Sequence, residues 1–333
     1  MSLINFLFRK KTFFLALLLL IVVIFLIIHL NLSKNSERRE ETGNIKISNV
    51  PQDSLDLGAG YSLELNSLVI EQESQVYGTI VMDSPQDKLE VHFDNRGNTG
   101  NFILKVLYDY EEVDFKIDNK NYQSSYPFHL ETGKSIRFPI ELASNITADK
   151  HSHKLLVAVY ASPEKNASTI EAMTNEYGMT LDYEITFNKS NQSFNSNKEY
   201  TSPEKKIKAE YQGLMVNENF NNFKEILYPP YNLKAKKGEK IKLAYNAGKY
   251  PEAKDYLIIS MLDWKQIEMN GAPYLFIKND PNFIDYGTFF ITAPDKEGLY
   301  EYSAVIVPDP YKHKNDEYYS SIETGYRFTI EVE

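Results

Sequence analysis

The sequence predicts a mainly β protein, with one N-terminal transmembrane helix followed by two β-sandwich domains. An uninterrupted apolar run at 13–28 predicts the helix. Segments in which apolar and polar residues alternate predict the sandwiches, because turns rich in Gly, Asn and Asp separate them at intervals of about 8–12 residues. The chain has 24 Tyr and 19 Phe in 333 residues, and aromatic side chains favour strands, where they pack well on the pleated surface.

The predicted membrane anchor comprises residues 12–32. Its sixteen consecutive apolar residues, extended by Leu30 and Leu32, approach the ~20 residues with which a helix crosses about 30 Å of hydrocarbon. A cleaved signal peptide is the alternative, but its apolar region is typically about 7–15 residues long and ends at a small-x-small site, which residues 29–33 lack. A buried core helix would normally have a polar face, which this run lacks.

Cations flank the N-terminal end of the anchor. Arg9, Lys10 and Lys11 directly precede it, and no acid lies before them, whereas most of the cations beyond the anchor are several residues away. Cations next to a membrane span favour the cytoplasmic side. We therefore expect residues 1–11 to be a cytoplasmic tail, residues 12–32 to cross the lipid bilayer of the cell membrane once, and the C-terminal domains to be extracytoplasmic.

Charge and cysteine content exclude several classes of protein. Beyond residue 33 the chain has 33 cations and 46 acids, a formal charge of −13, which argues against nucleic acid as a partner. The absence of cysteine excludes disulfides, thiolate metal ligands and cysteine nucleophiles. An extracellular domain without disulfides must be stabilised by its core alone, a composition that suits a Gram-positive bacterial surface.

The first predicted domain spans residues 55–187 and follows a polar stalk at 33–54. The stalk has too little apolar content to fold alone. Within the domain, alternation of apolar and polar residues is typical of half-buried strands. The segments with this pattern are 89–93, 102–108, 113–117, 128–140, 155–159 and 181–187.

A polar segment at 188–204 predicts an interdomain linker, and the second predicted domain spans residues 205–333. Tyr256 to Trp264 is almost continuously apolar and of strand length, which predicts a central strand buried on both faces. Tyr326 to Val332 alternates apolar and polar residues to the end of the chain.

Two regions resemble bacterial immunoglobulin-like surface modules. In the first domain, Asn95 and Gly97 form an Asn-x-Gly turn, and Leu130 to Ser135 matches a Leu-x-x-Gly-Lys-Ser unit before an apolar strand. In the second, Gly287 to Tyr302 is similar to the last hairpin of such a module, with Ala293-Pro294 within it. The resemblance implies an immunoglobulin-like sandwich fold and carries no catalytic residue, cofactor or ligand.

Two motifs suggest ligand sites, but structural roles explain both better. Thr132 to Ser135 ends like a phosphate-binding loop, yet Phe128 stands where the loop needs glycine and a strand follows instead of a helix. His151 and His153 would lie on one face of a strand and could share a metal. No third ligand is evident beside them, so we expect a solvated turn.

Three further groups carry side chains that could contact a partner or bind a ligand. Asp94, Asn95, Asn98 and Asn101 offer oxygen ligands for calcium, but these residue types also form turns and no bidentate glutamate follows at the required spacing. A polar loop at 309–319 carries Tyr311, Tyr318 and Tyr319, a possible contact surface for a protein or glycan. Trp264 follows an apolar run, so we expect it in a core.

No catalytic signature or cofactor motif is present. We therefore expect a membrane-anchored, extracytoplasmic interaction protein of the cell envelope that is not an enzyme, whose partner is another protein or an envelope polymer. Two alternatives stay open at this stage. One is an envelope carbohydrate-active enzyme whose carboxylates meet only in the folded protein. The other is a structural subunit of a membrane complex.

Overall fold

In the computed structural model, residues 45–333 form one compact unit. The described residues are 45–51, 59–67, 78–118, 120–166, 179–187, 193–194, 199–208, 212–218, 232–313 and 322–333. Among these residues no helix is long and apolar enough to span a membrane. The predicted anchor at 12–32, with its flanking Arg9, Lys10 and Lys11, lies outside them.

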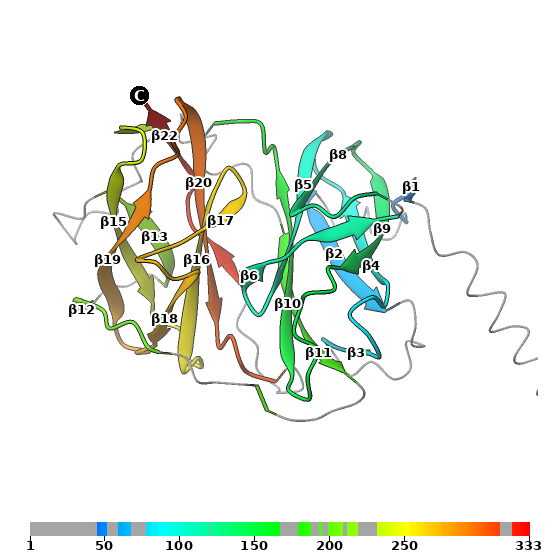
Figure 1. Ribbon diagram of the computed structural model, residues 1–333, viewed down its shortest axis with the longest axis horizontal. Helices are drawn as coiled ribbons and strands as arrows, with labels where there is room; N and C mark the ends of the chain where they lie inside the picture. The colour runs from blue at the N-terminus through cyan, green and yellow to red at the C-terminus, as the bar shows by residue number, and fades with distance from the viewer. Residues whose placement is uncertain are drawn as a thin grey trace, which may run out of the picture. The chain divides into compact units, whose positions relative to one another are not determined.

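The first sandwich consists of two packed sheets (Figure 1). One sheet has the strand order β1-β9-β4-β2, and β7 also pairs with β9. Its strands are β1 (Lys46–Asn49), β2 (Tyr61–Ser67), β4 (Leu89–Asn95), β7 (Phe115–Ile117) and β9 (Lys134–Leu142). The other sheet has the order β3-β11-β10-β5-β6, and β8 pairs with β5. Its strands are β3 (Thr79–Met82), β5 (Gly100–Tyr108), β6 (Glu111–Glu112), β8 (Ser125–Leu130), β10 (His153–Ala161) and β11 (Met179–Phe187).

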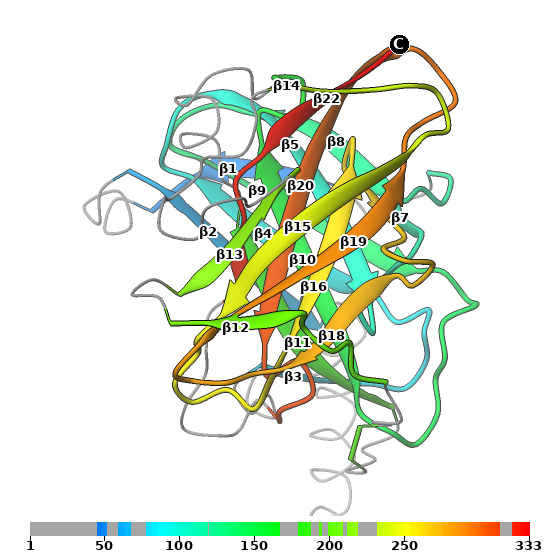
Figure 2. The ribbon, with the colours of Figure 1, turned by 90° about the vertical axis from the view of Figure 1, so that its left-hand side faces the viewer.

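The second sandwich has the same plan. Its outer sheet, which faces the viewer in Figure 2, has the order β12-β19-β15-β13. These strands are β12 (Lys205–Ile207), β13 (Gly213–Asn217), β15 (Lys240–Gly248) and β19 (Ile284–Thr292). The other sheet has the order β14-β22-β20-β16-β17, with β18 beside β16 and β21 beside β20. These strands are β14 (Asn232–Ala235), β16 (Asp255–Leu262), β17 (Lys265–Ile267), β18 (Tyr274–Lys278), β20 (Gly298–Pro308), β21 (Glu323–Thr324) and β22 (Phe328–Val332).

Both sandwiches have an immunoglobulin-like arrangement of strands. In each, a short strand pairs in parallel with the last strand of the sandwich, β3 with β11 and β14 with β22. The other described strand pairs are antiparallel, as in immunoglobulin-like sheets. The predicted mainly β fold, with its fold-level likeness to such modules, is confirmed for the described part of the chain. The expectation that Gly287 to Tyr302 forms a hairpin is wrong, because β19 and β20 belong to different sheets of the second sandwich.

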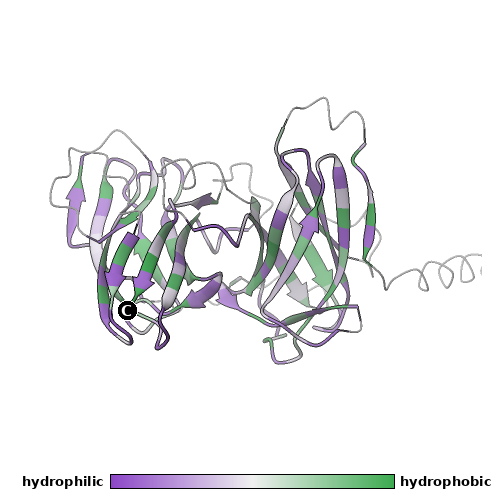
Figure 3. Ribbon diagram, turned by 90° about the horizontal axis from the view of Figure 1, so that it is seen from above, coloured by the Kyte–Doolittle hydropathy of each residue, from purple (hydrophilic) through white to green (hydrophobic). Residues whose placement is uncertain are grey.

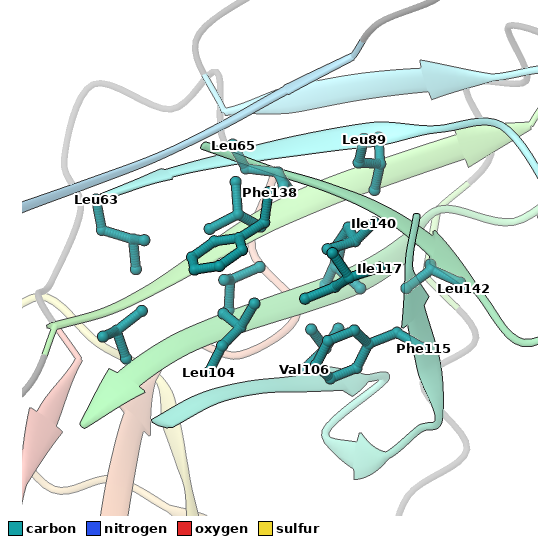
Figure 4. Close-up of a cluster of buried hydrophobic side chains, with 14 of the residues drawn as sticks. Leu63, Leu65, Leu89, Leu104, Val106, Phe115, Ile117, Phe138, Ile140 and Leu142 are labelled. Carbon is teal, nitrogen blue, oxygen red and sulfur yellow. The ribbon is translucent and has the colours of Figure 1, made fainter. Parts of the chain in front are cut away.

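Alternation of side chains builds each core. In β4, Leu89, Val91 and Phe93 are fully buried, while Glu90 and His92 between them are only partly covered. Figure 4 shows how side chains from facing strands fill the space between the two sheets of the first sandwich. The same alternation of apolar and polar residues runs along many strands of both sandwiches (Figure 3).

Two strands, β10 and β16, are buried on both faces. In β16, Tyr256 and Ile258 point into the second sandwich, whereas Leu257 and Ile259 belong to a third apolar cluster that also includes Leu156 of β10. The prediction that 256–264 contains a central strand buried on both faces is thus confirmed. The third cluster lies between the two sandwiches, because it joins residues of both.

The structure differs from the sequence-based expectation at two segments. Residues 46–49, expected in the stalk, form β1 because the edge of β9 is free to pair with them. Residues 199–204, expected in the linker, pack along the second sandwich. There Tyr200 stacks on Phe276 with ring centroids 4.7 Å apart, and the Glu204 amide donates to Tyr286 O at 2.8 Å.

Candidate functional site

Of the predicted contact loop, the structure describes Tyr311 but not Tyr318 or Tyr319. The Tyr311 ring is half-buried and lies 5.7 Å from the Tyr110 ring and 5.9 Å from the Phe276 ring. Burial raises the pKa of its hydroxyl well above the ordinary value. Much of Tyr311 therefore contacts other aromatic rings, and the role of this loop in binding stays a prediction.

Trp264 is buried, as predicted, with 6% of its surface exposed. Its ring lies between the two sandwiches, where the Tyr160 ring is 4.9 Å away and the Arg327 guanidinium lies over it at 4.7 Å. Its indole Nε1 donates a hydrogen bond to Pro163 O at 3.1 Å. A tryptophan packed in this way is unavailable for stacking on a sugar.

The expectation of a solvated His151–His153 turn is wrong for His153. His153 is 4% exposed, and its Nδ1 lies 2.7 Å from Asp109 Oδ2 while its Nε2 lies 3.3 Å from Asp149 Oδ1. Burial alone would lower the pKa of His153, but the hydrogen bonds and charges of the two carboxylates raise it above the ordinary value. His151 instead contacts Ser193 O through Nδ1 at 3.0 Å. The described residues contain no group of three side chains placed to hold a metal ion.

Two of the candidate calcium ligands, Asp94 and Asn95, form hydrogen bonds within the fold. Asn95 is fully buried, and its Oδ1 accepts from the Gly97 amide at 3.0 Å while its Nδ2 donates to Leu130 O at 3.1 Å. Asp94 Oδ2 accepts a hydrogen bond from Ser62 Oγ at 2.8 Å. The Asn95 bonds fix the Asn-x-Gly turn, which is the structural role expected of such residues.

A polar cluster on the outer face of β2, β4 and β9 was not predicted. His92 Nε2 lies 2.6 Å from Ser135 Oγ and 3.0 Å from Asp94 Oδ1, and His92 Nδ1 lies 3.6 Å from Glu64 Oε2. Serine, histidine and carboxylate also form nucleophilic triads. Ser135, however, is only 2% exposed, so its hydroxyl is not presented to a substrate. The alternation along β4 places His92 and Asp94 on one face, a signal that could have located this cluster.

A depression of about 580 Å³ lies at the edge of the outer sheet of the second sandwich, where β13 ends. Its lining includes Lys234, Lys240 and Lys242 together with Glu218 and Glu239. Figure 2 shows β13 ending alongside the longer β15. The last residue pair of these strands joins Asn217 to Ala244, so within the described chain residues 240–243 have no strand partner on this side.

Only some of the charged residues that line this depression have a partner among the described residues. Lys234 Nζ lies 3.4 Å from Glu331 and 2.5 Å from Glu333, and the Glu239 carboxylate accepts the Lys236 amide at 2.7 Å. Lys240 and Lys242 are exposed and form no ion pair with the residues that the structure describes. Within the described part of the chain, the site therefore offers two cations without an ion pair beside a stretch of strand without a partner, which suits an anionic, extended ligand.

Comparison with known proteins finds no matching family model and no match among curated proteins. Several solved structures match this chain, all with low sequence identity and a low TM-score. The C-terminal domain of the Streptococcus agalactiae AgI/II polypeptide BspA is 9% identical, with a TM-score of 0.24, over 82% of this chain and 100% of that one. The corresponding domain of Streptococcus pyogenes AspA is 8% identical, with a TM-score of 0.23 over 82% and 99%. The E. coli chaperone DraB is 11% identical, with a TM-score of 0.23 over 82% and 97%. Likeness at this level supports no conclusion about this chain.

Proposed function

We propose that this chain is a membrane-anchored, extracytoplasmic interaction protein of the cell envelope with no catalytic role of its own. The apolar run at 12–32 would hold it in the bilayer, with residues 1–11 in the cytoplasm and the two sandwiches outside. An anchored protein with two sheet modules is suited to holding a binding surface at a distance from the membrane.

The observation that carries the binding role is the lysine-lined depression beside β15. Lys240 and Lys242 are unpaired among the described residues, in a chain whose part beyond residue 33 has a formal charge of −13. A partner that runs along 240–243 could bond to the strand edge through its backbone or other polar groups, and its acidic groups could pair with the two lysines. Both an acidic protein segment and an anionic envelope polymer carry the negative groups that could pair with these two lysines.

Retention of the fragment 45–333 by purified envelope polymer and by membrane extract tests this proposal. The double variant Lys240→Glu/Lys242→Glu should weaken retention about tenfold, because both cations become like charges to an anionic partner. The matched control Lys278→Glu/Lys296→Glu makes the same change of charge at exposed positions outside the depression and should bind like the wild type. Equal retention of both double variants would contradict the proposed site.

The buried contact between the sandwiches favours a second candidate function, that of a structural subunit. Two modules packed against each other in this way could act as a spacer within a membrane complex. Copurification of membrane partners after mild solubilisation, with no change on Lys240→Glu/Lys242→Glu, would favour this role.

A further inference from the structure

The two sandwiches share a two-residue turn of the same unusual conformation. Asp109 and Tyr110 connect β5 to β6, and Asp263 and Trp264 connect β16 to β17. All four are non-glycine residues with positive φ, 49° and 68° in the first turn and 48° and 64° in the second. Consecutive left-handed residues form the tight hairpin turns that match the twist of β-strands. Each turn presents one aromatic side chain at the same place in its sandwich.

The bonds that hold these turns are also the same. The Asp109 amide donates to Lys154 O at 2.7 Å, and Asp109 Oδ1 accepts from the Lys154 amide at 2.9 Å. In the second sandwich, the Asp263 amide donates to Glu301 O and Asp263 Oδ1 accepts from the Glu301 amide, both at 2.8 Å. Lys154 of β10 and Glu301 of β20 are therefore equivalent residues.

Each aromatic side chain reaches the equivalent loop of the other sandwich. The Trp264 indole donates to Pro163 O, just after β10, at 3.1 Å, and the Tyr110 hydroxyl donates to Pro310 O, just after β20. The two loops match one another, since each begins with a left-handed residue, Ser162 at φ 49° and Asp309 at φ 45°. The contact is thus reciprocal: the turn of each sandwich bonds the loop of the other.

A second reciprocal pair of bonds starts from buried cations. Lys154 Nζ lies 3.7 Å from Asp182 in the first sandwich, and Arg327 Nε lies 3.0 Å from Glu301 in the second. Because Lys154 is equivalent to Glu301, the cation and the acid have exchanged positions between the two sandwiches. Lys154 Nζ donates across the contact to Lys312 O at 2.6 Å, while an Arg327 guanidinium nitrogen donates to Lys165 O at 2.7 Å. Lys165 and Lys312 each lie two residues after the proline of their loop.

At the centre of the contact, equivalent residues meet each other. The Glu112 amide of β6 donates to Gln266 Oε1 of β17 at 2.6 Å, and the Gln266 amide donates to Glu112 Oε2 at 3.0 Å. In a two-fold contact, only residues next to the axis touch their own equivalents. A local two-fold axis therefore passes between β6 and β17.

Apolar side chains of both sandwiches fill the contact around this axis. The residues of β5 and β10 that point away from the first core meet those of β16 and β20 that point away from the second. Leu107, Leu156 and Ala158 contribute from the first sandwich, and Ile259, Met261 and Val305 from the second. All six are at most 1% exposed.

We infer that the sheet face formed by β5, β6 and β10 is a docking surface for a second module of its own kind, and that the chain supplies this partner itself. The second sandwich presents the equivalent face, formed by β16, β17 and β20. The pair thus reproduces within one chain the two-fold contact of a dimer of single modules. This face is consequently covered by the second sandwich and closed to external partners.

Cross-linking of the full chain tests the position of the axis. The protein has no cysteine, so Glu112→Cys/Gln266→Cys introduces one unambiguous pair. Mild oxidation should give a monomer with an internal disulfide that migrates faster on a non-reducing gel. The control pair Glu112→Cys/Lys296→Cys should give no internal disulfide. Failure of the first pair to cross-link, or cross-linking only between chains, would overturn the inference.

Paired substitutions test whether the contact is two-fold. Tyr110→Ala and Trp264→Ala should each lower the midpoint of a single thermal transition by similar amounts, on the order of 5–10 °C. The double variant should lose less than the sum, because both changes weaken one shared contact. Phe290→Ala, at a side chain 45% exposed, should leave the midpoint unchanged. Separate transitions for the two sandwiches, or a loss from only one of the two substitutions, would contradict the inferred symmetry.

Discussion

His153 shows how tertiary pairing gives a residue a role that local sequence does not indicate. Its neighbourhood of Lys150, His151 and Lys154 suggested a solvated turn. Pairing of β5 with β10 brings Asp109 beside it, so the imidazole is buried between Asp109 and Asp149. The resulting rise in the pKa of His153 couples the stability of the first sandwich to pH.

This coupling predicts a loss of stability above neutral pH. The His153 ion pairs stabilise the fold fully below the unfolded-state pKa of about 6.5, and this contribution is lost as pH rises through the higher folded-state pKa. His153→Gln should remove this dependence of stability on pH. At a mildly acidic pH, above the range in which carboxylates titrate, it should also lower the free energy of unfolding by about 1–3 kcal/mol. Urea unfolding across this pH range measures both effects.

The control for this prediction is His129→Gln, because His129 is exposed. It should keep the wild-type dependence of unfolding free energy on pH. A wild-type protein whose stability does not fall as pH rises through neutrality would contradict the proposed role of His153.

Gly287 is a second residue whose role depends on its surroundings. A Cβ at this position would lie 2.5 Å from Cζ of Tyr245, a fully buried side chain. Gly287→Ala should therefore cost about 1–3 kcal/mol of stability, since the Tyr245 ring must shift in a filled core. Gly100→Ala is the matched control, because its nearest neighbour would be 4.0 Å away. Equal midpoints of denaturant unfolding for the two variants would show that the core can accommodate the added methyl group.

At the scale of single elements, β10 and β16 differ from ordinary sandwich strands. Their consecutive apolar residues alternate between a sandwich core and the contact between sandwiches. The sequence predicts burial of β16 on both faces because the run of 256–264 is almost unbroken. It does not indicate what covers the second face, since burial within a larger sheet stack would produce the same pattern.

Because β16 is buried on both faces, alanine substitutions at two consecutive positions should lower the free energy of unfolding by similar amounts. Ile258→Ala removes contacts within the second sandwich, and Ile259→Ala removes contacts between the sandwiches. Each should lower the free energy of unfolding by about 2–5 kcal/mol. Thr292→Ala, at an exposed position of β19, should change it by less than about 0.5 kcal/mol. A negligible cost for Ile259→Ala would mean that the sandwiches are not held by this contact.

At the scale of the whole molecule, much of the strand pattern was predictable, but the candidate site was not. Alternation in β4, β11 and β22 and the Asn95–Gly97 turn identify sheet modules directly. The lysine-lined depression lies where β13, as far as the structure describes it, pairs only with residues 244–248 of β15 and leaves residues 240–243 without a partner on that side. The length of a strand is poorly determined by local sequence pattern. The contact between sandwiches depends on the Asp109–Tyr110 and Asp263–Trp264 turns, which lack the glycine that usually marks such turns.

The proposed membrane topology is the claim on which the function depends, and cysteine labelling tests it directly. Because the chain has no cysteine, Ser2→Cys and Lys296→Cys place single thiols before the predicted anchor and on the exposed surface of the second sandwich. In intact cells, a membrane-impermeant maleimide should label Lys296→Cys and should label Ser2→Cys only after permeabilisation. Labelling of Ser2→Cys but not Lys296→Cys in intact cells would contradict the proposed topology.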